Sequence, residues 1–267
     1  MQNILSKWLE PKSVETHPYG NYQLIETKEK NPFPSQLIPL ICEAMINARI
    51  DLGYYSTLAK QYSWSKLIQL LSGNVSPTFL PMQRGFFGEV LVCKMLEEFH
   101  GYHIPVQKWR YAITKNQSLT GTDALAIRVS NGKISEICFV ETKLRTVTNK
   151  VAAAEGLNQL KSDYSKEIPD IILFVLNRLE ERNDPLLPAF QSYFLNRKDM
   201  TDNECFYLGL IWETNVWTDE VLVNVKLNSD TVKLPRLTVN QTCIKDLASL
   251  IAMLYRKIGM VEPSDDE

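Results

Sequence analysis

The sequence predicts an α/β protein of the α+β kind, with a mixed β-sheet core flanked by helices and an N-terminal helical extension. Helical periodicity dominates the first third of the chain, whereas short strand-like segments alternate with helices after residue 83. The chain is 45% hydrophobic and 22% charged, a composition typical of a globular protein with a sizeable core. We therefore expect a mainly helical extension over residues 1–80 and a core over residues 81–267.

In the N-terminal region, prolines that end secondary structure and apolar residues at helical spacing predict the elements. Residues 22–28 resemble a strand, which the Asn-Pro-Phe-Pro segment at 31–34 should end. Ser35 is a suitable N-cap for a helix over residues 36–52, and a second helix is expected over residues 57–72.

The core begins with a helix and a predicted hairpin. An apolar stripe predicts a helix over residues 86–99, and three segments have strand character: 102–106, 122–129 and 134–144. The last two are separated by Asn131-Gly132, the strongest short hairpin signal.

The rest of the chain is predicted to contain both helices and strands. Helices are expected over residues 150–165 and 189–197, and a final helix from Thr242 to Ile258. The apolar runs at 170–177, 206–212 and 221–227 favour strands.

The charge balance limits how the chain could bind nucleic acid. The formal net charge is −2, whereas tight nonspecific DNA binding usually requires a basic surface. Either a local basic patch binds phosphates or a partner delivers the nucleic acid. Between residues 143 and 166 the chain carries five basic residues with few acids among them: Lys143, Arg145, Lys150, Lys161 and Lys166. They form either such a patch or a solvated helix face.

The other compositional features point to a soluble cytoplasmic protein. No apolar run reaches the roughly 18 residues that span a bilayer, and the first residues are too polar for a signal peptide. The five cysteines include no Cys-x-x-Cys pair, which argues against a zinc ribbon or a disulfide framework.

Charged residues gather at one end of the predicted hairpin. Because side chains alternate along a strand, Asp123 continues the apolar row of its strand, and Glu141 and Lys143 continue the row of the next. Pairing about Asn131-Gly132 brings Asp123 and the 141–143 segment to the same end of the sheet. Two carboxylates and an ammonium group should therefore converge.

A divalent cation would explain why these carboxylates and this ammonium group converge. Neighbouring buried carboxylates repel each other, and oxygen-only ligation suits Mg²⁺ or Mn²⁺. Such an ion polarises a phosphodiester and lowers the pKa of a bound water, while Lys143 is placed to orient that water. The alternatives are a turn cap at Asp123 and a rim ion pair between Glu141 and Lys143.

The combination of motifs resembles the PD-(D/E)xK nuclease superfamily. It consists of Gly121-Thr122-Asp123, Glu141-Thr142-Lys143 and an upstream helix that carries Glu89; Thr122 replaces the nominal proline of that family. Glu-x-Lys also occurs at 10–12 and 26–28, but without this context. The resemblance implies a restriction-endonuclease-like core, Glu89 as a third metal ligand beside Asp123 and Glu141, and Gln159 as a further catalytic residue. For Glu89, the alternative is a solvated helix residue.

Size and layout also resemble HamA, the nuclease subunit of the Hachiman anti-phage defence system. This resemblance implies a helicase subunit as partner and DNA as substrate, so that the chain itself need not be basic. A second hypothesis is a nuclease-like fold that no longer cuts and instead serves as an adaptor for a partner protein or a DNA end. The acidic balance and the helical N-terminal third favour that alternative.

Overall fold

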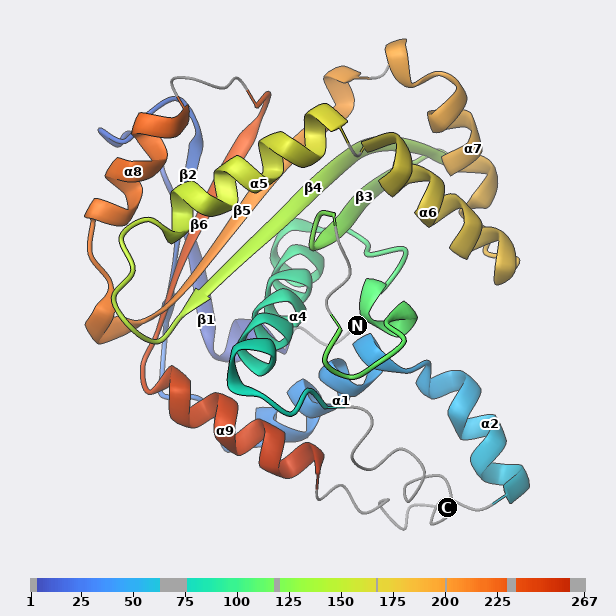
Figure 1. Cartoon of the computed structure of the whole chain (residues 1–267), viewed down its shortest axis with the longest axis horizontal. Helices are drawn as coiled ribbons and strands as arrows, with labels where there is room; N and C mark the ends of the chain where they lie inside the picture. The colour runs from blue at the N-terminus through green and yellow to red at the C-terminus, as the bar shows by residue number, and fades with distance from the viewer. Residues whose placement is uncertain are drawn as a thin grey trace.

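The protein, seen in a computed structural model, has a mixed α/β fold built on one six-stranded sheet (Figure 1), which confirms the predicted fold class. The structure describes residues 4–62, 76–117, 121–166, 168–199, 201–229 and 234–259. Its strands are β1 (Leu9–Val14), β2 (Gln23–Glu29), β3 (Ala124–Ser130), β4 (Lys133–Arg145), β5 (Glu204–Glu213) and β6 (Leu237–Ile244). They lie in the order β1-β2-β6-β5-β4-β3, with the inner four parallel and both edge strands antiparallel to their neighbours.

Helices cover both faces of this sheet (Figure 1). One face carries α1 (Ile38–Arg49), α4 (Leu80–His100) and α9 (Leu247–Ile258). The other carries α5 (Ala152–Lys166), α6 (Ile168–Glu181), α7 (Leu187–Leu195) and α8 (Glu220–Ser229). Helix α2 (Leu52–Tyr62) extends away from the sheet. A sheet with both faces covered buries its central strands completely, which explains the long apolar runs of β4 and β5.

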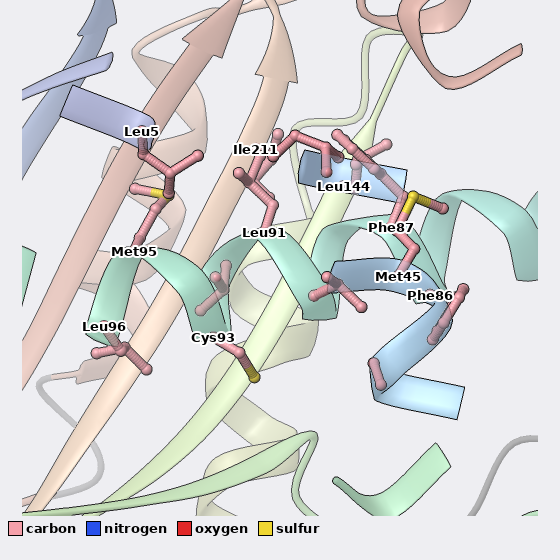
Figure 2. Packing of buried hydrophobic residues seen from close by; sticks show 14 of the residues in the cluster. Leu5, Met45, Phe86, Phe87, Leu91, Cys93, Met95, Leu96, Leu144 and Ile211 are labelled. Carbon is pink, nitrogen blue, oxygen red and sulfur yellow. The ribbon is translucent and has the colours of Figure 1, made fainter. Parts of the chain in front are cut away.

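Helix α4 packs directly against the sheet. Figure 2 shows Leu91 and Met95 of α4 directed toward Ile211 of β5 and Leu5, all within one buried apolar cluster. The helix ends at Gly101, whose left-handed backbone (φ 67°) is a common way to terminate a helix. This packing fixes the position of every side chain that α4 turns toward the sheet.

The β3–β4 hairpin forms as predicted. Asn131 (φ 51°) and Gly132 (φ 71°) both have left-handed backbones, as a two-residue type I′ turn requires. Ala124 pairs with Val140 and Leu125 with Phe139. Asp123 therefore lies immediately beyond the paired part of β3, next to Glu141.

Two predicted strands are helices. Residues 170–177 lie within α6, and residues 221–227 lie within α8. In α6 the fully buried positions are Ile168, Ile172, Val175 and Leu179, a spacing of three and four that follows one helical face. The prediction failed because the many β-branched and leucine residues concealed this period.

Two further predictions were wrong in part. Residues 102–106 form only an isolated bridge, in which His103 exchanges two backbone hydrogen bonds with Ile127. Pro105, which has no N–H, prevents the pairing from continuing. The predicted helix from Thr242 instead begins at Leu247, because residues 237–244 form β6.

Strand β6 was not predicted because it contains several polar residues. Asn240 is buried between its neighbours, where it bonds to the Thr27 hydroxyl (3.0 Å) and the Tyr207 hydroxyl (2.5 Å). Such a satisfied polar network can occupy a central strand, although its residue types favour loops.

The N-terminal region differs from the prediction in detail. Ser35 is not an N-cap, since it starts a short 3₁₀ turn and α1 begins at Ile38. Helix α2 begins at Leu52 rather than 57, and the expected continuation of this helix to residue 72 lies outside the described residues. Strand β1 was not predicted because Pro11 interrupts it; an edge strand tolerates proline.

The N-terminal segment supplies part of the common sheet. Strands β1 and β2 both come from residues 1–80, and β2 pairs with β6 in the centre of the sheet. The division at residue 80 stays a prediction. No helix in the described ranges is both long and apolar enough to cross a membrane.

The close approach of β5 and α4 generates a stability prediction. A Cβ atom added at Gly209 would lie 2.6 Å from Cγ2 of Val92. We expect Gly209→Ala to lower the free energy of unfolding by about 1–3 kcal/mol, because the packed helix has to shift. Urea denaturation measures this change.

The matched control is Gly85→Ala on α4, where an added Cβ meets nothing within 4 Å. This substitution should raise the free energy of unfolding by roughly 0.5–1 kcal/mol, since alanine favours the helix. Equal stability of the two variants would contradict the proposed packing.

Candidate active site

Four of the five predicted site residues lie at the open end of the β3–β4 hairpin, opposite its turn. Glu89 belongs to α4, Asp123 directly precedes β3, and Glu141 and Lys143 lie in β4. Glu141 is 4% exposed at its side chain, so its ion pair with Lys143 is not a rim contact. The cluster therefore combines three chain segments that are distant in sequence.

A lysine that the sequence did not reveal links two of the acids. The Lys108 Nζ atom lies 3.7 Å from Oε2 of Glu89 and 3.2 Å from Oδ1 of Asp123. All three side chains are largely buried: Lys108 and Glu89 are 11% exposed and Asp123 is 15% exposed. Lys108 thus acts as a shared counter-cation for these two carboxylates.

Hydrogen bonds hold both acids in position. The backbone N–H of Thr142 donates to Oδ2 of Asp123 (2.7 Å), which ties Asp123 to β4. The indole N–H of Trp109 donates to Oε2 of Glu89 (2.6 Å). Lys108 and Trp109 belong to a 3₁₀ turn, Lys108–Tyr111. Asp123 is therefore anchored across strands, which differs from the alternative of a simple turn cap.

Glu141 and Lys143 form the second charged pair. The Nζ atom of Lys143 donates a hydrogen bond of 2.6 Å to Oε1 of Glu141. Helix α5 passes close above, since a Cβ atom added at Gly156 would lie 3.1 Å from Cγ of Lys143. Because Gly156 has no side chain, the aliphatic part of Lys143 can pass beside α5 at this point.

Burial and repulsion shift the pKa values of Glu89 and Glu141 upward. Burial raises the pKa of Glu89 well above its usual range, and the charge of Asp123 adds to the effect. Burial, with Asp123 again adding, raises the pKa of Glu141 to about 8, although Lys143 opposes the shift. Burial acts to lower the pKa of Lys108, but Glu89 and Asp123 outweigh it, so the net pKa is raised and the ammonium stays charged. The cluster has more negative charge than its lysines compensate.

The donor set has the chemistry of a hard-cation site. Its three acids offer only carboxylate oxygens, the ligand type that Mg²⁺ and Mn²⁺ prefer. Glu89 and Asp123 already share one cation, the ammonium of Lys108, and a cavity of about 10 Å³ touches all three residues. Within the part of the chain that the structure describes, no three His, Cys, Asp or Glu residues form a ready-made ligand set. The acids therefore suit a hard cation, although each of them pairs with a lysine here.

The other expected residues have different surroundings. Gln159 is exposed on α5 and its amide donates to Oδ1 of Asp163 (2.7 Å); no described contact joins it to the three acids, and its catalytic role stays a prediction. Of the five basic residues that follow the motif, Arg145 pairs with Glu155 (3.5 Å) and Lys150 with Glu220 (2.5 Å). These two pairs reduce the positive charge that a phosphate-binding patch would need.

The raised pKa of Glu141 predicts a pH dependence of stability. Between the ordinary value of 4.5 and about 8, the folded protein retains a proton that the unfolded chain has lost. Stability therefore falls as pH rises through this window. In metal-free buffer, Glu141→Gln should lose less stability between pH 5 and pH 8 than the original chain, as measured by urea denaturation at each pH.

The control for this experiment is Glu155→Gln, which changes an exposed carboxylate on α5. It should keep the original dependence on pH, because the substituted side chain is exposed and does not belong to the buried cluster. If Glu141→Gln also left the dependence unchanged, the carboxylate of Glu141 would not be held in the environment described here.

Comparison with known proteins places the chain in a family. The family model described as HamA matches residues 25–258, which includes every residue of the site. The search of curated proteins found no match.

Proposed function

The chain belongs to the HamA family, and on that premise we propose that it is a metal-dependent nuclease that hydrolyses phosphodiester bonds of DNA. The family is part of the multi-component Hachiman defence system, so the chain has a role related to defence. The observation that supports the proposed chemistry is the group of three largely buried carboxylates that meets two lysines beside adjacent strands.

In this proposal, Glu89, Asp123 and Glu141 would hold Mg²⁺ or Mn²⁺. When bound, the ion would polarise the phosphodiester and screen its developing charge. The Thr142 N–H fixes the orientation of Asp123, and Trp109 fixes that of Glu89. The protein thus supplies ligands whose positions are set before substrate arrives, which is the main source of electrostatic catalysis.

Lys143 has a separate task in the proposed reaction. Its ammonium has three N–H donors, and the bond to Glu141 uses one. A second donor would bind a non-bridging phosphate oxygen or the attacking water, and would stabilise the negative charge that grows during attack. The buried carboxylate of Glu141 keeps Lys143 aligned for this contact.

We further propose a helicase subunit as the partner that delivers DNA. A chain of net charge −2, in which Arg145 and Lys150 already pair with acids, is poorly suited to hold DNA by charge alone. A partner that supplies the phosphate contacts would remove this difficulty.

One observation favours a second function, that of a catalytically inactive adaptor. Lys108 already pairs with Glu89 and Asp123, and Lys143 pairs with Glu141, so lysines offset part of the charge of the acids without a metal. In this alternative the acids and lysines hold the hairpin against α4, and the chain binds a partner protein or a DNA end without cutting.

The decisive experiment is plasmid cleavage in Mg²⁺ with the partner helicase present. Glu141→Ala combined with Lys143→Ala should reduce cleavage by roughly 10²-fold or more, because both a ligand and a charge-stabilising donor are lost. A matched control exists in β2, where Glu26-Thr27-Lys28 repeats the tripeptide with an ion pair of 2.9 Å.

The double variant Glu26→Ala, Lys28→Ala should cut like the original chain. Equal cleavage by the original chain and the 141/143 variant would end the nuclease proposal. Absence of cleavage in every sample, together with retained binding of the partner, would favour the adaptor.

A further inference from the structure

Lys108 occupies a position for which neither the motif nor the family match gives a role. We propose that Lys108 is a tethered cation that competes with the divalent metal for Glu89 and Asp123, and so sets how tightly the metal binds. This inference rests on the proposed function, because it assumes that these acids are metal ligands.

The contacts of Lys108 are those of a cation in a binding site. Its Nζ atom lies within 3.7 Å of three oxygen atoms from two places in the chain: Oε2 of Glu89 (3.7 Å) on α4, and Oδ1 of Asp123 (3.2 Å) with the carbonyl oxygen of the preceding Thr122 (3.2 Å). Two carboxylates and one backbone carbonyl are also the donors that hard metal ions select. The ammonium thus uses the same oxygens that a metal would need.

Charge makes the two occupants mutually exclusive at these oxygens. One ammonium offsets only one of the two carboxylates, so the pair still attracts further positive charge. A divalent ion placed on the same oxygens would lie close to the ammonium, and the two cations would repel each other. Metal binding therefore requires Lys108 to leave, and its interaction with the acids is lost.

The surroundings allow Lys108 to leave. It lies in the short turn Lys108–Tyr111 and its charge is carried on a flexible four-carbon stem. A cavity of about 10 Å³, roughly enough for one water molecule, borders Lys108, Glu89 and Asp123. Trp109, which is buried and bonded to Glu89, keeps the turn and the acid in place while the lysine side chain moves.

The test is a calorimetric titration of the full chain with Mn²⁺. Lys108→Met should bind Mn²⁺ at least about 10-fold more tightly than the original chain, since the competing charge is gone and the methionine stem has similar length. The matched control is Lys94→Met on α4, whose ammonium pairs with the carboxylate of Glu97 (2.6 Å) rather than with an acid of the site. This control should bind Mn²⁺ like the original chain.

Asp123→Asn separates this inference from the proposed function. If Asp123→Asn abolishes Mn²⁺ binding but Lys108→Met binds no more tightly than the original chain, the competition is refuted and the metal site stands. If neither the original chain nor Lys108→Met binds Mn²⁺ in a manner that depends on Asp123, the metal-dependent function fails as well.

A second measurement covers the case in which Lys108→Met is too unstable to titrate. Lys108→Gln retains an N–H donor without the charge, and its melting temperature can be followed with and without Mn²⁺. We expect Mn²⁺ to raise the melting temperature of Lys108→Gln by more than that of the original chain. An equal or smaller increase would overturn the inference.

Discussion

The site depends on one electrostatic constraint: three carboxyl groups, which repel one another when ionised, are buried together at the open end of one hairpin. Asp123 is attached to β4 through the Thr142 N–H, Glu89 is held by Trp109, and Glu141 is almost fully buried. Such a group is stable only if cations compensate it. Lys108 and Lys143 supply that compensation within the chain, and α4 with the sheet fixes the framework around them.

This arrangement links the fold to the proposed chemistry. The upward pKa shifts of Glu89 and Glu141 show that the lysines do not fully offset the cost of burial and repulsion. A cation that binds the acids would relieve this cost, so cation binding at the site is energetically favoured. Membership of the HamA family gives the site a biological setting in Hachiman defence.

The sequence predicted those parts of the fold whose signals are local. Asn131-Gly132 specified the hairpin, and alternation along β3 and β4 assigned their faces. Helices α6 and α8 were mistaken for strands, because β-branched composition outweighed a helical period that only burial reveals. Lys108 could not be found, because its partners are Glu89 and Asp123, brought to it by tertiary packing, and its own segment has no periodic pattern.

The most direct test of the central claim is a crystal structure of the full chain grown with Mn²⁺, with anomalous scattering measured at the manganese edge. The account predicts one anomalous peak bonded to oxygens of Glu89, Asp123 and Glu141, with the Nζ atom of Lys108 moved away from Asp123. A structure at saturating Mn²⁺ that shows no peak among these acids, with Lys108 still bonded to Asp123, would contradict it.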